Sequence, residues 1–257
     1  PNEEVMLYAN ESTGFKSGGF NRFRPPADGG MDYDLVYEPE TITNFEAGIK
    51  ADWMDGTMRT NLAVYYNEID DLQAYAFDNS VPSSVTTNAG EASTFGVELE
   101  NTYAPSPGVQ LQAIVAYMDA EYDEYGTFNN GSQNIDASGN TRELSPELKA
   151  TLTARYEFSL GDYGTLSPYI QFTFKDEYYV TAANESVFGL DKQDSYTQTD
   201  IKLFWESKDS HWSGELYIQN LEDEFPMTGG FLATNGYWIT YGPEPRTYGA
   251  RLTYRYK

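Results

Sequence analysis

Few residues in this sequence could carry out catalysis or hold a metal ion. Asp70 and Asp71 are adjacent carboxylates, but on a strand their side chains point to opposite faces, so we expect a structural or solvated role. His211 is the only histidine and there is no cysteine, which argues against a transition-metal centre and a Ser–His–Asp triad. Three segments rich in Asp, Asn and Gly lack the spacing of a calcium loop: 27–34, 78–80 and 129–140. The sequence therefore predicts no enzymatic activity, no metal site and no cofactor.

Basic and aromatic residues in the long connecting segments are better candidates for ligand binding. Near the N-terminus, Lys16, Arg22 and Arg24 have the charge needed to bind an anionic ligand. Aromatic rings contribute contact area at low entropic cost and can grip an amphipathic ligand. The candidates of this kind are Tyr33, Tyr75, Phe77, Tyr125, Phe128, Phe231 and Trp238. These rings can equally pack the segments against one another, and the sequence leaves both roles open.

The elements that must position these residues are long β-strands. In the segment 44–53, NFEAGIKADW, apolar and polar residues alternate, and the pattern resumes after a tight turn at 54–56. Most of the alternating segments are longer than the roughly 5 to 6 residues of ordinary globular strands and suit a tilted strand that crosses a bilayer. The predicted strands are 4–14, 42–53, 57–69, 88–103, 109–122, 147–158, 166–178, 196–206, 213–221 and 246–256.

The connections between these strands alternate strictly between short and long. The short ones are 54–56, 104–108, 159–165 and 207–212, and the long ones are 15–41, 70–87, 123–146, 179–195 and 222–245. A soluble sandwich has no reason to sort its loops by length, whereas an outer-membrane barrel has short periplasmic turns and long extracellular loops. The pattern therefore favours a transmembrane, antiparallel, up-and-down β-barrel of about ten strands.

The two faces of the strands indicate which medium each one meets. On strands running toward the short turns, the last outward residue is aromatic, as in a lipid-interface girdle: Trp53, Tyr103, Phe158, Trp205 and Tyr256. The opposite face is polar and mixed in charge, which a dry core would not tolerate. On that face, Gly48, Gly96 and Gly249 could let a neighbouring ring or another segment approach the wall closely. We expect lipid outside and water or protein inside.

Composition excludes other classes of protein. Forty acidic and sixteen basic residues give a formal charge of -24, which argues against binding nucleic acid or anionic lipid headgroups. No apolar run approaches 18 residues, so a transmembrane helix is not expected. Aromatic residues make up 16% of the chain and there are 22 glycines, which favours a β-protein with many turns.

Several segments resemble a known family. GFKSGGFN (14–21), the long stretch 37–73, NAGEASTFGVELE (88–100), NLEDEF (220–225) and PRTYGARLTYRY (245–256) are similar to the C-terminal barrel half of TonB-dependent outer-membrane receptors. The likeness is greatest to the iron-complex (siderophore) receptors of Gram-negative bacteria, and it runs over essentially the whole chain.

The resemblance implies a 22-stranded barrel, of which residues 1–257 would form the last ten strands. It also implies a bacterial outer-membrane location and transport of a scarce nutrient, most simply a ferric siderophore or other iron complex. The basic loop residues would then meet a ferric chelate. Uptake would be driven by the periplasmic protein TonB acting on a plug domain. Neither plug nor TonB box is visible here, so we expect a piece of a longer polypeptide. Family members usually end on an aromatic residue, whereas Lys257 follows Tyr256 here.

Two questions stay open at the level of sequence. The alternative to a transporter is a β-sheet module that recognises carbohydrate or protein through its long loops; it predicts that the apolar faces of 45–53 and 148–158 pack against a second sheet. The first and last strands also have edges that cannot remain unpaired in lipid. They must pair with strands outside this chain or with each other.

Overall fold

The computed structural model describes residues 4–22, 35–78, 83–88, 90–125, 128–129, 134–184, 189–232 and 237–256. Within these ranges the chain is built from β-strands, and helical structure is confined to one 3-10 turn, η1 (Gly161–Tyr163). The described residues contain no helix of the length and apolarity needed to cross a membrane.

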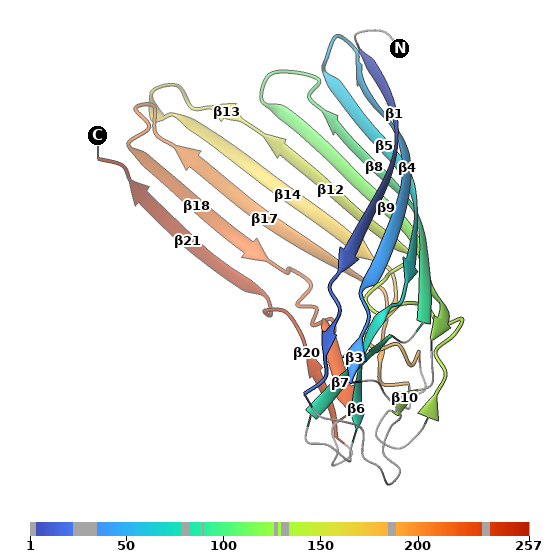
Figure 1. The fold of residues 1–257 in the computed structure, drawn as a ribbon. Helices are drawn as coiled ribbons and strands as arrows, with labels where there is room; N and C mark the ends of the chain where they lie inside the picture. Colours follow the sequence, from blue (N-terminus) through green and yellow to red (C-terminus); the bar gives the residue numbers. More distant parts are fainter. Residues whose placement is uncertain are drawn as a thin grey trace.

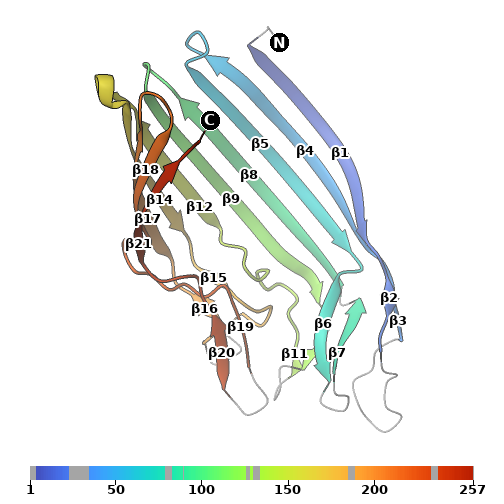
Figure 2. The same cartoon turned by 90° about the vertical axis from the view of Figure 1, so that its left-hand side faces the viewer.

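Ten strands form one antiparallel path in which each strand pairs with the next along the chain (Figures 1 and 2). They are β1 (Val5–Lys16), β4 (Glu40–Trp53), β5 (Met58–Asp70), β8 (Gly90–Tyr103), β9 (Val109–Tyr125), β12 (Leu148–Tyr156), β14 (Thr165–Lys175), β17 (Tyr196–Glu206), β18 (Trp212–Gln219) and β21 (Thr247–Tyr254). The short β13 (Phe158–Ser159) pairs beside β14. The predicted all-β, up-and-down order is confirmed.

The connections are sorted by length onto opposite ends of the sheet. Figure 1 shows the short turns at the upper end and the long loops at the lower end. In the turn after β4, Met54, Asp55 and Gly56 have φ values of 53°, 57° and 81°. This left-handed run reverses the chain within a few residues, as a hairpin turn requires.

The long loops contain secondary structure that the alternation pattern did not predict. Among the described residues, each of these loops carries a small two-stranded sheet (Figure 2). The hairpins are β2 (Gly19–Phe20) with β3 (Val36–Tyr37), β6 (Gln73–Asp78) with β7 (Ser83–Asn88), β10 (Phe128–Asn129) with β11 (Asn134–Ile135), β15 (Tyr178–Tyr179) with β16 (Lys192–Gln193), and β19 (Gly229–Leu232) with β20 (Trp238–Tyr241). The loops are therefore folded extensions of the sheet.

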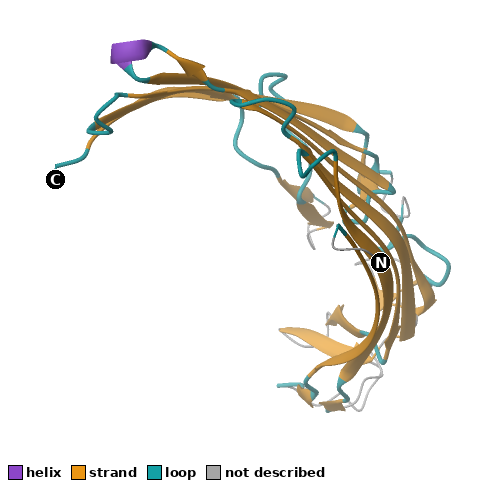
Figure 3. Cartoon of the chain, turned by 90° about the horizontal axis from the view of Figure 1, so that it is seen from above, coloured by secondary structure: helices purple, strands orange, loops and turns teal. Residues whose placement is uncertain are grey.

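Seen from above, the sheet is an open arc (Figure 3). β1 and β21 lie at its two ends, and within the described residues they do not pair with each other. The ten strands thus do not close into a small barrel. Both edges present unpaired backbone groups, which a bilayer-spanning sheet must satisfy with further strands.

The apolar residues of the strands lie on a face that nothing in the described chain covers. Phe45, Trp53, Leu152 and Phe158 are 43%, 42%, 51% and 44% exposed. The prediction that these faces pack against a second sheet is therefore wrong. An exposed apolar belt of this extent is the outer wall of a membrane barrel.

The long loops fold toward the concave side of the arc (Figure 3). Ile42, Ile69 and Ala92 share their parity with the polar residues of β4, β5 and β8, and they pack against loop residues in a common cluster. Because these alternate strand positions contact the inward-folded loops, their side chains lie on the interior face of the sheet. Glu46, Lys50 and Glu98 share this parity and therefore face the interior, where water or protein can solvate them.

Tyrosine rings cover glycines on the interior face in three places. Tyr8 lies opposite Gly48, Tyr65 opposite Gly96, and Tyr217 opposite Gly249 on the neighbouring strand. A Cβ on Gly96 would lie 2.3 Å from Tyr65 Cζ, one on Gly48 would lie 2.5 Å from Tyr8 Cε1, and one on Gly249 would lie 2.7 Å from Tyr217 Cζ. The close approach of a neighbouring ring, one of the two roles expected for these glycines, is confirmed.

We predict that Gly96→Ala destabilises the folded barrel by about 1–3 kcal/mol, because the new methyl group must displace the Tyr65 ring from the wall. The measurement is the temperature at which the detergent-solubilised protein loses its folded, heat-modifiable form. Gly214→Ala is the matched control, since its Cβ would lie at an ordinary 3.6 Å from the Trp205 ring. Equal melting temperatures for the two variants would contradict the prediction.

Aromatic residues mark both ends of the apolar belt. The predicted set lies at the short-turn end, where Trp53 Nε1 donates to Thr60 Oγ1 at 3.2 Å and Trp205 Nε1 to the Tyr163 carbonyl at 2.9 Å. A second set lies about eight residues back along the strands and comprises Phe45, Tyr66, Phe95, Tyr117 and Tyr248. Eight residues span about 26 Å along a strand and about 20 Å across a membrane at a tilt of about 40°. This separation is somewhat smaller than the apolar band of about 25 Å on outer-membrane barrels.

Candidate functional site

The candidate site is the loop-bearing end of the interior face, which we call the mouth. Of the residues expected to bind ligand there, Arg24 and Tyr33 lie outside the described residues. The backbones of Tyr75 and Phe77 belong to β6 and that of Phe128 to β10, but their side chains are outside the described part. Their proposed contact with ligand stays a prediction.

The remaining candidates have distinct surroundings. Lys16 Nζ lies 3.6 Å from Glu40 Oε2, so part of its charge is already compensated, while Arg22 is exposed. Phe231 is 45% exposed in β19. Trp238 in β20 is half-buried, and its Nε1 is buried without a hydrogen-bond partner among the described residues. Phe231 and Trp238 are therefore the aromatic candidates whose described surroundings still permit ligand contact.

Tyr125 is only 8% exposed and belongs to the buried cluster in which residues of the second and third long loops pack against Ile69 and Ala92 of the wall. Its ring centroid lies 4.7 Å from that of Tyr122 in an edge-on arrangement, and Tyr122 donates a hydrogen bond to Glu143. Burial, with Glu143 nearby, raises the pKa of Tyr125 to about 12 and raises the pKa of Tyr122 as well. Both phenols therefore stay neutral at physiological pH. Tyr125 fits the loop-packing role rather than ligand contact.

Amide side chains fasten the first two loops to each other. Asn21 Nδ2 donates to the Thr86 carbonyl at 2.7 Å and its Oδ1 accepts from the Thr86 N–H at 2.8 Å. Gln73 Nε2 donates to the carbonyls of Ser17 and Glu38, both at 3.0 Å. Asn21 and Gln73 are each only 8% exposed, so these hydrogen bonds are sheltered from water. Neither residue was identified as important from the sequence.

The later loops are joined in the same manner. Asn140 Nδ2 donates to the Ala182 carbonyl at 2.8 Å, which links the third long loop to the fourth. The Tyr178 hydroxyl donates to the Met227 carbonyl at 2.6 Å, and the Met227 N–H donates to Gln193 Oε1 at 2.7 Å, which links the fourth to the fifth. Leu72 and Ala74 of the second loop share a buried cluster with Ala137 of the third, so the hairpins around the mouth form a connected rim.

The segment 220–225, NLEDEF, is a folded turn that anchors the last long loop. Glu222 accepts hydrogen bonds from the N–H and hydroxyl of Thr199 on β17, at 2.7 Å and 2.5 Å. Asp223 accepts the N–H of Arg246 at 2.9 Å, and the Arg246 guanidinium donates to the Leu221 carbonyl at 3.1 Å. Although burial opposes ionisation, the two hydrogen bonds from Thr199 leave the pKa of Glu222 below its ordinary value. These acidic residues are therefore structural.

Comparison with known proteins decides which family has this architecture. A sequence model described as "TonB dependent receptor-like, beta-barrel" matches residues 1–221. The chain belongs to the TonB-dependent receptors. As a barrel segment of this family it lies in the bacterial outer membrane, and its relatives are receptors rather than enzymes.

Two curated receptors are similar along most of the chain. The metal-pseudopaline receptor CntO of Pseudomonas aeruginosa (strain UCBPP-PA14) is 27% identical over 98% of this chain and 32% of its own length. The pesticin receptor of Yersinia pestis is 25% identical over 90% of this chain and 31% of its own length. This receptor segment therefore spans about a third of the curated relatives that it matches.

Solved structures of the family share the fold. The ferric yersiniabactin uptake receptor FyuA of Yersinia pestis matches with a TM-score of 0.77 at 21% identity, over 98% of this chain and 35% of its own. The siderophore receptor PiuA of Acinetobacter baumannii matches with a TM-score of 0.75 at 21% identity, over 100% of this chain and 34% of its own. At this identity the likeness establishes the arrangement of strands.

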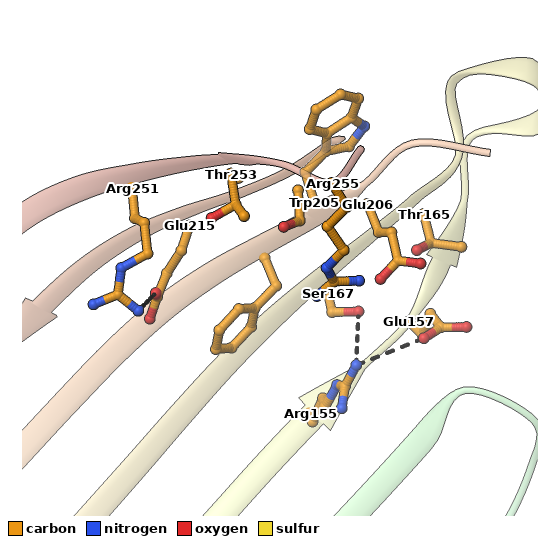
Figure 4. A pocket seen from close by; sticks show the side chains of 13 residues that line it. Arg155, Glu157, Thr165, Ser167, Trp205, Glu206, Glu215, Arg251, Thr253 and Arg255 are labelled. Atoms are coloured by element: carbon orange, nitrogen blue, oxygen red, sulfur yellow. Dashed lines mark hydrogen bonds and ion pairs between the residues drawn. The ribbon is translucent and has the colours of Figure 1, made fainter. Parts of the chain in front are cut away.

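The receptor segment also has a pocket of about 400 Å³ on the interior wall, near the short-turn end and away from the mouth (Figure 4). Arg155 Nη2 lies 3.4 Å from Ser167 Oγ and 3.6 Å from Glu157 Oε2. Arg251 Nη1 donates to Glu215 Oε2 at 3.4 Å. Figure 4 shows both pairs on the wall of the pocket. Arg155 and Arg251 are already paired with carboxylates, whereas Arg255, which also lines the pocket, has no carboxylate partner among the described residues.

The acidic pair and the single histidine occupy separate regions of the receptor segment. Asp70 ends β5, and Asp71 follows it in the left-handed conformation with φ of 55°. His211 lies in a short turn, with Nδ1 3.1 Å from Asp209 Oδ2. Hydrogen bonds from the Ser207 hydroxyl and the His211 N–H lower the pKa of Asp209. No group of three or more potential metal ligands is found among the described residues.

Proposed function

We propose that this chain forms the C-terminal part of the barrel of a receptor that imports an iron–siderophore complex or a related metal chelate. Its strands supply the wall, and its long loops, which are joined by hydrogen bonds, supply part of the ligand-binding mouth. The energy-dependent step would be performed by TonB acting on a plug domain in a segment outside this chain. The observation that carries the proposal is the match of residues 1–221 to the barrel of TonB-dependent receptors.

Two further findings support this cargo. The similar proteins include a metal-pseudopaline receptor and a ferric yersiniabactin uptake receptor, both named for metal chelates. The mouth combines basic residues with exposed aromatic rings, which suits an amphipathic chelate with anionic groups. Vitamins and oligosaccharides would be the next cargoes to examine.

The test is uptake of radioactive iron by cells that carry or lack the complete receptor. Under iron restriction, deletion of the receptor gene should abolish uptake from at least one ferric chelate, and a plasmid copy should restore it. Deletion of the TonB gene should abolish the same uptake. Unchanged uptake from every ferric chelate in the receptor-deleted strain would overturn the iron proposal, and transport of another nutrient would then be examined.

A further inference from the structure

Two lysines face each other on the interior wall at the mouth. Lys149 on β12 and Lys175 on β14 are direct partners in the antiparallel register. Directly opposed residues of this kind have Cβ atoms about 4.5–5.5 Å apart and project to the same face. Thr151 and Arg155 share the parity of Lys149, and Arg155 lines the interior pocket, so both lysines point inward.

The position of this pair places it within reach of a ligand in the mouth. Lys149 is the second residue of β12 and Lys175 the last residue of β14, so both lie at the long-loop end. On the outer face, the neighbouring residue Leu148 pairs with Tyr117 of the second aromatic set, the one nearer the long loops. The pair is therefore level with the outer edge of the lipid belt.

Neither lysine has an acidic partner in the described part of the chain. Other cations do: Lys192 Nζ lies 2.9 Å from Glu177 Oε1, and Arg59 Nε lies 2.7 Å from Asp52 Oδ1. Opposed like charges destabilise a sheet, and this chain has 40 acidic residues from which a partner could have come. Within the described residues no carboxylate pairs with either lysine and the Tyr178 ring contacts Lys175 alone, so both ammonium groups remain available to an anion.

Contacts from two long loops position one lysine of the pair. Lys175 Nζ lies 4.0 Å from the centroid of the Tyr178 ring, and Tyr178 is only 2% exposed. The same tyrosine donates to the Met227 carbonyl, so the fourth and fifth long loops jointly position Lys175. Next to the lysines, the hydroxyls of Thr151 and Thr173 lie 3.4 Å apart and can donate to the same anion.

We propose that Lys149 and Lys175 form a subsite for the carboxylate oxygens of an anionic metal chelate, with the hydroxyls of Thr151 and Thr173 as further donors. This inference rests on the proposed function and specifies the chemistry of its ligand. The sequence predicts cationic ligand contacts in the first long loop, where Lys16 proves to lie beside Glu40. The proposed subsite instead places a cationic contact on the barrel wall. Two ammonium groups at one site select for ligands with at least two negative charges.

The experiment is a titration of the complete receptor, in detergent micelles, with ferric citrate as an anionic, carboxylate-rich probe. Binding is followed by quenching of tryptophan fluorescence at low and high salt. The double variant K149Q/K175Q should bind at least about tenfold more weakly than wild type, and raising the salt should weaken binding to the wild type more than to the variant. K149R/K175R should bind within about threefold of wild type, since both charges remain. Lys208→Gln, in a short turn, is the control for net charge.

Three results would overturn the inference. The first is equal binding by K149Q/K175Q and wild type, and the second is loss of thermal stability in the double variant with binding unchanged, which would assign the lysines to a protein contact. The third is failure of wild type to bind ferric citrate although the cells import iron from another chelate. In that case the proposed function would stand while this subsite would not. Absence of all chelate uptake would instead refute the proposed function.

Discussion

Leu152→Arg should prevent most of the receptor from assembling in the outer membrane, whereas Thr153→Arg, one residue further on, should leave assembly intact. Leu152 lies at the middle of β12 and is 51% exposed on the outer face. Arginine near the midplane of a bilayer costs a transmembrane barrel about 2–4 kcal/mol. Thr153 faces the interior between Gln112 and Gln171, where a guanidinium stays hydrated.

The measurement is the folded fraction in outer-membrane preparations, read from heat-modifiable migration on gels and from surface proteolysis. Both variants introduce arginine into the same strand. A difference in their folded fractions therefore reflects only which face of the sheet carries the arginine. Equal assembly of the two would show that the apolar face is not in contact with lipid. Loss of only the Thr153 variant would show that the two faces have been assigned the wrong way round.

The alternation of side chains made the barrel predictable from the sequence. Side chains alternate between the two faces of a strand, so alternating apolar and polar residues show which medium each face contacts. This signal lies within the strand's own sequence. The segment 44–53 therefore predicted β4 and its outward face without any tertiary information. The alternation of short and long connections could also be predicted from the sequence, because it depends only on where the strands begin and end.

The folded mouth was not predictable in the same way. Asn21 bonds to the backbone of Thr86, 65 residues away, and nothing in the residues around Asn21 signals this contact. The small hairpins in the loops are stabilised by such contacts rather than by a long alternating pattern. For the same reason, Tyr125 could be named as a ligand candidate but could not be recognised as part of a buried cluster.

Two features could have been predicted from the sequence by counting residue positions. A hairpin centred on residue 162, the midpoint of the turn predicted at 159–165, places Lys149 opposite Lys175, as the register shows. The second aromatic set follows from pairs spaced eight residues apart, such as Phe45 with Trp53 and Phe95 with Tyr103. Both signals depend on counting positions across or along strands, whereas the candidates named from the sequence were selected by residue type.

Tyr122→Ala should loosen the rim of the mouth while the barrel wall stays folded. Tyr122 is 3% exposed, its ring packs edge-on against Tyr125, and the Arg142 guanidinium lies 6.0 Å from its centroid. Removing a buried aromatic ring costs about 3–5 kcal/mol, and that loss falls on a loop cluster rather than on the strand ladder beneath it. The readout is the rate of limited proteolysis within 134–144 in intact cells, compared with the heat resistance of the barrel.

The conservative variant Tyr122→Phe separates packing from hydrogen bonding. It keeps the ring and removes only the hydroxyl that donates to Glu143, so its cost should be about 1 kcal/mol and its loops should resist protease nearly as wild type does. Tyr125→Ala then decides the role of its own residue. If Tyr125 packs the rim, as its burial indicates, its loss should increase loop cleavage as that of Tyr122 does. Weaker chelate binding with normal protease resistance would instead make Tyr125 a ligand contact, and the cluster would have to open when ligand binds.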